Sequence, residues 1–364
     1  MKVLFIDLDW TSLMCFRKEL VFSLLADGHD VNVVVRDNGD FSELTNAGAK
    51  LIPFNAQMKS KNPFSNLRDI KAYKKMIRGV SPDIILSFTI KPNLYAGIAN
   101  KERIPQIANV TGLGKPFEKK GLLRRLTCSL YKRAYKNIST VFYQNEEEPK
   151  DLERLGIKAK HYVVIPGSGV NTERFSYREY PHNDRFIFVY MSRVMKRKGI
   201  DNFLKLAISY HNENKLADFY VVGRHDEDYK KMIDKYADEG VVKYIPFTKT
   251  PEEYYIKADA VVLPSYYLEG TNNVLLEASA SGRPILTSLD TPGCNNVLID
   301  GVNGFGFHAL SFDELKAAAD RLFSLPREER EKMGRAAREN VLTKFDRRIV
   351  IQHYKDEIQR LSSK

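Results

Sequence analysis

The sequence has few cysteines and no long apolar run. Its three cysteines, at positions 15, 128 and 294, are far apart and form neither a disulfide framework nor a paired metal site. No stretch approaches the roughly eighteen apolar residues that a transmembrane helix needs. The apolar N-terminal run is broken by Asp7 and Asp9, and no small-residue cleavage site follows, so we expect no signal peptide. These absences predict a reduced, cytoplasmic protein.

Motifs for nucleic-acid binding are also missing. The net charge of +11 is compatible with nucleic acid, an anionic membrane or phosphorylated ligands as partners. No zinc-finger, helix-turn-helix or RNP-type pattern accompanies this charge, so no nucleic-acid partner is expected. A non-catalytic basic protein that binds nucleic acid stays an alternative, which a steep salt dependence of binding would reveal.

The basic residues are concentrated over 59–75 and 115–136. In the second segment, Leu122, Leu123 and Leu126 are interleaved with lysines and arginines. An apolar stripe on a basic helix is typical of a helix that lies on an anionic membrane. A core-facing helix with a solvated basic face has the same pattern, and the sequence leaves both interpretations open.

Apolar strands alternate with helices in both halves of the chain, and 364 residues exceed what one core usually supports. We expect strands at 3–7, 31–35, 51–54, 83–88, 104–110, 139–145, 162–170, 186–192, 219–223, 241–247, 260–265 and 283–288. Continuous apolar strands between helices predict parallel sheets covered on both faces. The expected fold is therefore α/β, with two doubly wound Rossmann-like domains facing a central cleft.

The domain boundaries follow from the polar segments. Residues 171–185 are predicted to be a linker, which gives domains 1–170 and 171–346. The helix predicted over 347–364 is expected to pack back on the first domain.

The most informative string is LPSYYLEGTNNVLLEASASGRPILTS, which starts at position 263. Glu269 lies in a loop after a strand, and Glu277 lies eight positions further on, inside a helix that starts near Asn272. Carboxylates accept pairs of hydroxyl hydrogen bonds from a sugar or a ribose. The turn between them offers the backbone N–H groups of Gly270, Thr271 and Asn272 to a diphosphate. Either glutamate alone would indicate little, but the whole string indicates a ligand with hydroxyls and phosphates.

A second string, MSRVMKRKGIDNF over 191–203, follows the first strand of the second half. The planar fork of Arg193 and the point charge of Lys198 can neutralise a leaving diphosphate without a divalent metal. Alone, these residues could equally be solvated cations of a basic loop.

Together the two strings resemble the E-x7-E signature and the S/G-R-x4-K-G motif of GT-B glycosyltransferases of family 4, a retaining group. The resemblance covers 186–307 and, through shorter strings, the first half. It implies that Glu269 contacts the transferred sugar, that Glu277 binds the ribose, and that the diphosphate lies between Arg193 and Lys198. It further implies these residues on the donor side: Gly270, Thr271, Asn272, Asn273, Val274, Gly223 and Arg224.

In the first half, NVTGLGKPF (109–117) and PGSGV (166–170) resemble the subset of this family that elongates lipid-linked saccharides. The resemblance implies an acceptor side that contains Thr111, Gly112, Gly114 and Lys115. Two glycines so close together allow the backbone to approach a ligand.

The resemblance predicts transfer of a hexose or N-acetylhexosamine from a nucleotide sugar, expected to be a UDP-sugar. The expected acceptor is a saccharide, polyprenyl-diphosphate-linked, met at an anionic membrane surface on the inner face of the cell membrane. No metal is expected, because Asp7 and Asp9 end the first strand of a doubly wound domain, which does not fit a metal-binding D-x-D motif. A nucleotide-sugar epimerase on the same fold is the alternative, and it would release epimerised sugar without an acceptor.

Overall fold

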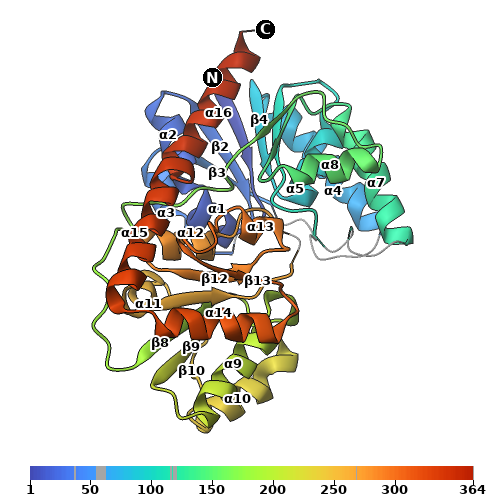
Figure 1. The fold of residues 1–364 in the computed structure, drawn as a ribbon. Coiled ribbons are helices and arrows are strands. Elements are labelled where there is room, and N and C mark those ends of the chain that lie inside the picture. The colour runs from blue at the N-terminus through green and yellow to red at the C-terminus, as the bar shows by residue number, and fades with distance from the viewer. Residues whose placement is uncertain (37, 55–62, 115–116, 118–120, 268, 364) are drawn as a thin grey trace. The chain divides into compact units, whose positions relative to one another are not determined.

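The computed structural model describes residues 1–36, 38–54, 63–114, 117, 121–267 and 269–363 (Figure 1). Contacts within the chain divide it into two compact units. Unit 1 contains Met1–Ser168 and Arg348–Lys364, and unit 2 contains Gly169–Arg347. Each unit has its own parallel sheet and its own hydrophobic core.

The sheet of unit 1 has seven parallel strands in the order β3-β2-β1-β4-β5-β6-β7. They are β1 (Lys2–Ile6), β2 (Asp30–Val35), β3 (Lys50–Pro53), β4 (Ile84–Phe88), β5 (Gln106–Asn109), β6 (Thr140–Tyr143) and β7 (Tyr162–Val164). Val3 of β1 pairs with Val31 on one side and Ile84 on the other, so the strand order reverses between β1 and β4. Such a reversal marks the place where doubly wound sheets bind ligands, at the carboxyl ends of the strands.

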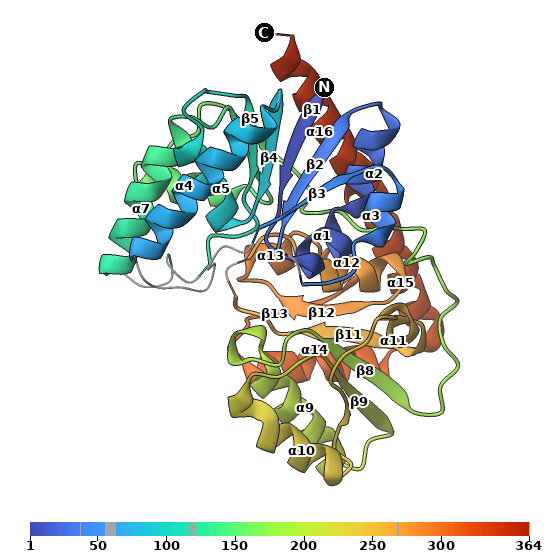
Figure 2. The same cartoon turned by 180° about the vertical axis from the view of Figure 1, so that it is seen from behind.

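Helices cover both faces of this sheet. They are α1 (Trp10–Phe16), α2 (Lys18–Ala26), α3 (Ser42–Asn46), α4 (Pro63–Val80), α5 (Ile90–Ala99), α7 (Leu122–Tyr135), α8 (Glu147–Arg154) and α16 (Arg347–Ser362). Figures 1 and 2 show α4, α5 and α7 together on one face and α2, α3 and α16 on the other. Tyr354 of α16 packs against Phe142 and accepts a hydrogen bond from Asn109. The C-terminal helix is thus part of the core of unit 1.

The sheet of unit 2 has six parallel strands in the order β10-β9-β8-β11-β12-β13. They are β8 (Phe186–Met191), β9 (Ala217–Val222), β10 (Lys243–Ile245), β11 (Ala260–Leu263), β12 (Ile285–Ser288) and β13 (Gly304–Phe307). The order again reverses after the first strand, here between β8 and β11. A Cβ at Gly304 would overlap the carbonyl oxygen of Ile285, which explains a glycine-rich string in a strand.

The helices of unit 2 include some that the sequence did not predict. The helical elements are η1 (Lys196–Lys198), α9 (Ile200–Asn212), η2 (Glu227–Tyr229), α10 (Lys230–Asp238), α11 (Glu252–Lys257), α12 (Asn273–Ala280), α13 (Pro292–Asn295), α14 (Phe312–Ser324) and α15 (Arg327–Lys344). The longest helix without a prediction is α15, whose buried face contains Gly334, Ala337 and Asn340 beside Met333 and Val341. Gly334 lies directly against the backbone of Gly282. Such small and polar contact residues give a weak hydrophobic period.

The segment 171–185, predicted as a linker, contains no helix or strand and belongs to unit 2. Arg283 is fully buried and donates to the carbonyl oxygen of Arg178 at 3.0 Å. Arg338 donates to the carbonyl oxygen of Phe175, also at 3.0 Å. These guanidinium groups satisfy the backbone of an irregular segment and make it an ordered part of unit 2.

Candidate functional site

Two loops meet at the point in unit 2 where the strand order reverses. The loop after β8 carries Lys198, and the loop after β11 carries Glu269. The ammonium group of Lys198 donates a hydrogen bond to Oε1 of Glu269 and forms an ion pair with it. The lysine side chain is 8% exposed and the glutamate side chain 21%. The structure thus brings together two predicted site residues that are far apart in the sequence.

Backbone packing explains why the two loops meet. Gly199 has a φ of 76°, and a Cβ there would overlap the carbonyl oxygen of Pro264 at the end of β11. The backbone N–H of Tyr266 donates to the carbonyl oxygen of Arg197 at 3.0 Å. Because only glycine permits this approach, the turn that carries Lys198 lies directly on the loop of the glutamate.

The turn after Glu269 is held by a short segment around α13. The backbone N–H of Asn272 donates to the carbonyl oxygen of Gly293 at 2.9 Å. Asn272 is buried, and its side-chain amide donates to Oε1 of Glu269 at 2.8 Å. The prediction that the N–H of Asn272 faces a diphosphate is therefore wrong, because Gly293 packs against the backbone of Gly270 and accepts that hydrogen.

The other predicted residues of this turn lie at or beside the N-terminus of α12. The hydroxyl oxygen of Thr271 accepts a hydrogen bond from Asn296 at 2.8 Å. Gly270 is buried, and Val274 packs against the core of unit 2. The buried Oδ1 atom of Asn273 has no hydrogen-bond partner among the described residues. An unsatisfied buried oxygen leaves bonding capacity for a ligand at this helix end.

Glu277 lies on α12 and accepts a hydrogen bond from the hydroxyl group of Tyr255 at 2.8 Å. Burial raises the pKa of Glu277 to about 7, although Arg347 and Arg174 favour its ionised form. The carboxyl group therefore titrates near neutral pH. The sequence analysis missed Tyr255, which lies on α11 and belongs to no recognisable motif.

Gly223 and two arginines line the same edge of the sheet. Gly223 has a φ of 144°, and a Cβ there would overlap the carbonyl oxygen of Ser192. The guanidinium group of Arg193 is exposed. That of Arg224 lies 4.7 Å from the ring centre of Phe247, which is half-exposed after β10. An exposed aromatic residue just after a strand was the signal that the sequence analysis overlooked.

In unit 1, the predicted acceptor residues lie in the loop after β5. Gly112 and Gly114 have φ values of 109° and 66°, which only glycine adopts readily. Thr111 is partly buried. Lys115 lies outside the described residues.

Glu148 of α8 is a residue of this region that the sequence analysis missed. It is buried, and its carboxylate accepts the backbone N–H of Gln144 at 2.9 Å. Burial raises the pKa of Glu148 to about 8, while hydrogen bonds from the backbone of Gln144 and Gly112 lower it. A buried carboxyl group thus lies close to the glycine-containing loop.

The two aspartates after β1 have structural roles. Asp7 is buried, accepts the hydroxyl hydrogen of Ser12 at 2.6 Å, and forms an ion pair with Arg17 at 3.4 Å. Burial raises the pKa of Asp7. Asp9 accepts the backbone N–H of Ser12 at 3.0 Å and caps α1. Within the described ranges, no three His, Cys, Asp or Glu side chains are grouped as a metal site would require.

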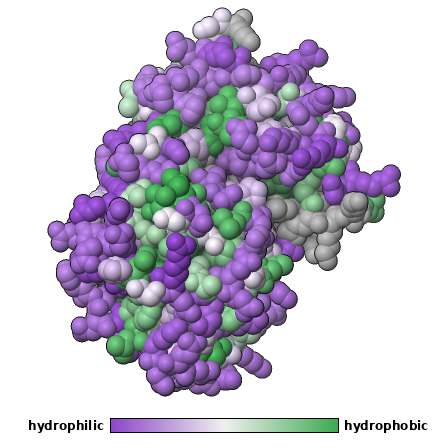
Figure 3. Space-filling view, in the orientation of Figure 1, coloured by the Kyte–Doolittle hydropathy of each residue, from purple (hydrophilic) through white to green (hydrophobic). Residues whose placement is uncertain are grey.

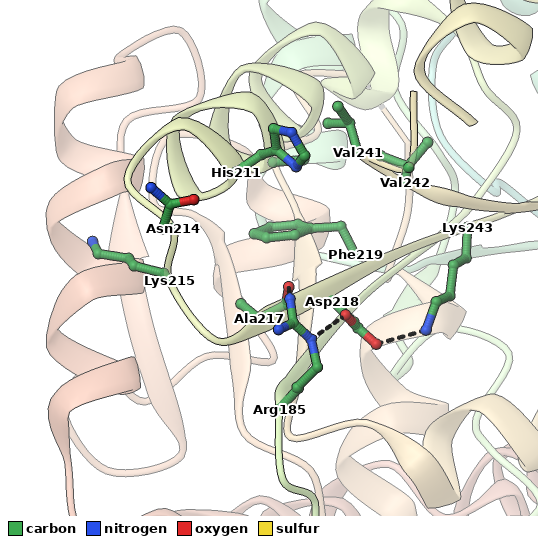
Figure 4. Close-up of a pocket in the computed structure, with 12 residues that line it drawn as sticks. Arg185, His211, Asn214, Lys215, Ala217, Asp218, Phe219, Val241, Val242 and Lys243 are labelled. Carbon is green, nitrogen blue, oxygen red and sulfur yellow. Dashed lines mark hydrogen bonds and ion pairs between the residues drawn. The ribbon is translucent and has the colours of Figure 1, made fainter. Parts of the chain in front are cut away.

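A separate cavity of about 250 Å³ opens in unit 2 at the amino ends of β9 and β10 (Figure 4). The carboxylate of Asp218 in this cavity accepts hydrogen bonds from Arg185 at 2.7 Å and from Lys243 at 2.6 Å. These charges satisfy one another, and the cavity lies at the opposite edge of the sheet from Lys198 and Glu269. We assign no ligand to it.

The chain has two doubly wound units, which is the architecture of the GT-B fold, and a Lys–Glu pair lies at the strand-order reversal of the second unit. Residues 172–340 match the family model described as "Glycosyl transferases group 1", and residues 2–145 match the model "Glycosyl transferase 4-like". The two models together cover most of the chain, which is a glycosyltransferase.

Two relatives resemble nearly the whole chain. The "N,N'-diacetylbacillosaminyl-diphospho-undecaprenol alpha-1,3-N-acetylgalactosaminyltransferase" of Campylobacter jejuni is 26% identical over 97% of this chain and 97% of its own length. The capsular polysaccharide biosynthesis glycosyltransferase CapM of Staphylococcus aureus is 25% identical over 88% of this chain and 87% of its own length.

Solved structures share the fold. A sucrose-phosphate synthase from Thermosynechococcus elongatus superposes with a TM-score of 0.81 at 17% identity, covering 100% of this chain and 99% of its own. Anabaena HepE in complex with UDP-glucose gives a TM-score of 0.78 at 17% identity, covering 99% of this chain and 100% of its own.

Proposed function

We propose that the protein transfers a hexose or N-acetylhexosamine, with retention at the anomeric carbon, from a UDP-sugar to a polyprenyl-diphosphate-linked saccharide. The observation that carries this proposal is the contact between Lys198 and Glu269 at the reversal point of unit 2. A cation and a carboxylate at that place suit the two halves of the donor, its diphosphate and its sugar.

In the proposed mechanism, the diphosphate leaves while positive charge gathers around it. Arg193, Lys198 and the N-terminus of α12 supply this charge. The leaving diphosphate itself helps to deprotonate the acceptor hydroxyl, and Glu269 orients the sugar. Glu277 binds the ribose. These groups supply the potential that other transferases obtain from a divalent metal, so we propose that no metal takes part.

The relatives support the choice of substrates. HepE was solved with UDP and with UDP-glucose, and it has the same fold as this chain. The Campylobacter relative is named for transfer of N-acetylgalactosamine to a sugar diphosphate on undecaprenol. Its similarity extends over 97% of this chain and therefore over both units.

Helix α7 supports peripheral docking at the inner face of the cell membrane. Leu122, Leu123 and Leu126 are 72%, 63% and 56% exposed, so they are not core residues. The core-facing side of α7 consists of other residues, among them Tyr131, Ala134 and Tyr135. The three exposed leucines support the proposal that α7 contacts a membrane surface. Arg124 and Arg125 lie between them, and a basic residue near an anionic surface contributes about 1 kcal/mol.

The surroundings of α7 are compatible with this role. In Figure 3, purple side chains lie beside green ones at the tip where Figure 1 places α7. Leu67 of α4 is also exposed, and α5 packs between α4 and α7. None of the helices in the described ranges is long and apolar enough to cross a bilayer.

The test is a screen of common nucleotide sugars with an undecaprenyl-diphosphate-linked saccharide, which measures nucleoside diphosphate release with and without EDTA. We expect acceptor-dependent release of UDP that persists in EDTA, and a product that keeps the donor's anomeric configuration. Epimerised free sugar without acceptor would favour the epimerase. Absence of release from every donor would contradict the proposal.

A further inference from the structure

The side-chain amide of Asn272 donates hydrogen bonds to Glu269 and to Cys294. The side-chain nitrogen of Asn272 donates a hydrogen bond to Oε1 of Glu269 at 2.8 Å. The same nitrogen donates to the sulfur of Cys294 at 3.8 Å. Burial raises the pKa of Cys294 to about 11, so this sulfur is a neutral thiol near neutral pH. The backbone N–H of Asn272 donates to the carbonyl oxygen of Gly293, and this bond fixes the position of the Asn272 backbone.

We infer that Asn272 is a positioning residue for Glu269 rather than a ligand of the diphosphate. Lys198 and Asn272 both donate to Oε1, and no hydrogen bond reaches Oε2 within the part of the chain that the structure describes. The two donors hold the carboxylate in one orientation and leave Oε2 for hydroxyls of the donor sugar. This inference rests on the proposed donor site.

Two donors on one oxygen have different chemical roles. Lys198 supplies charge, which the leaving diphosphate also attracts when the donor is bound. Asn272 is neutral and buried, so it continues to hold Glu269 while the lysine interacts with phosphate oxygens. Losing such a support displaces a reacting group by a fraction of an ångström to about 1 Å, which costs up to about a hundredfold in rate.

The first test compares Asn272→Ala with wild type. We expect kcat to fall by about tenfold to a hundredfold, and affinity for the UDP-sugar to fall, while affinity for UDP alone in calorimetry changes less than about threefold. Retention of kcat within about threefold would overturn the inference. So would equal losses for UDP and UDP-sugar, since Asn272 would then act on the diphosphate.

The second test uses Asn272→Asp, which has the same shape. Two adjacent carboxyl groups share a proton at low pH and repel each other once that proton is lost. The protonated Asp at 272 replaces the amide donor, so the turnover of this variant relative to wild type should fall about tenfold between pH 5.5 and 8.5. The matched control is Asn295→Asp, an exposed amide in α13, whose ratio should stay flat. A flat ratio for Asn272→Asp would overturn the inference.

Thermal unfolding separates this inference from the proposed function. If wild type uses no nucleotide sugar, the proposed function fails, but the contact can still be tested. The Tm of Asn272→Asp relative to wild type should then fall as pH rises from 5.5 to 8.5, because the shared proton stabilises only the folded pair. An unchanged Tm difference would overturn the contact itself.

Discussion

In unit 1 the segment after the first strand, β1, carries Asp7 and Arg17, and in unit 2 the segment after the first strand, β8, carries Lys198. Both sheets reverse their strand order at that strand. The pair in unit 1 is almost fully buried, and Ser12 donates a hydrogen bond to Asp7, whereas Glu269 in unit 2 keeps an exposed edge. The same topological position thus holds a buried pair in one unit and, in the other, a partly exposed pair that we propose as the donor site.

The largest effects should follow from removing the charged groups of unit 2. We expect Glu269→Gln, Arg193→Ala and Lys198→Ala each to lower turnover by about a hundredfold or more, because each removes an electrostatic contact of the transition state. Initial rates with the identified UDP-sugar measure this, and circular dichroism checks the fold. Lys196→Ala, an exposed lysine in the same turn, is the matched control. Near-wild-type turnover in all three variants would place the site elsewhere.

The buried pair of unit 1 should instead affect stability. Asp7→Asn leaves Arg17 without its charged partner, and breaking a buried pair costs about 3 kcal/mol. Trp10, the single tryptophan of the chain, lies on α1 and reports urea unfolding of unit 1 by fluorescence.

The control for this change is Asp9→Asn. Asparagine caps a helix about as well as aspartate, so we expect a loss below about 0.5 kcal/mol. A loss for Asp7→Asn as small as that of the control would show that the pair does not stabilise unit 1.

Membrane binding is a second property in which the two units should differ, because α7 belongs to unit 1. Reversing Arg124 and Arg125 to Glu should weaken binding to anionic vesicles by at least about tenfold, because each basic residue contributes about 1 kcal/mol. Co-sedimentation at low and high salt measures this. The matched control changes two exposed lysines of the same unit, Lys158 and Lys160, to Glu. Equal binding by both variants, or no preference for anionic lipid, would contradict docking through α7.

The smallest effect concerns pH. The pKa of Glu277 is about 7 in the folded protein. In the proposed site its ionised carboxylate accepts ribose hydroxyls, so protonation below pH 7 should raise the donor KM severalfold between pH 8 and pH 6. Glu277→Gln should have a raised KM with no such pH dependence. A wild-type KM that is constant over this range would show that Glu277 does not bind the ribose.

The parts of the fold that the sequence predicts are those with strong local patterns. Apolar strands such as 260–265 are predicted from their continuous hydrophobicity. The doubly wound order is predicted from the alternation of these strands with helices. Helix α15 escaped prediction because its buried face relies on glycine, alanine and asparagine. The 171–185 segment looked like a linker because its order depends on distant arginines.

The candidate site shows the same division. Lys198 and Glu269, the charged residues of the two motif strings, contact each other, and this contact depends on Gly199 next to the lysine. Asn272 was assigned to the diphosphate because the sequence does not reveal its bond to Gly293, which lies 21 positions further along the chain. Tyr255 and Glu148 carry no local signal, since their roles arise only from tertiary packing.

The central claim is that Lys198 and Glu269 form the donor site of unit 2. Calorimetric titration of UDP into wild type, Lys198→Ala and Lys196→Ala tests it most directly. A cation that bonds a diphosphate contributes a charge-assisted hydrogen bond, so we predict that Lys198→Ala weakens UDP binding by at least about tenfold. Lys196→Ala should stay within about twofold of wild type. Equal affinity of Lys198→Ala and wild type for UDP would contradict the claim.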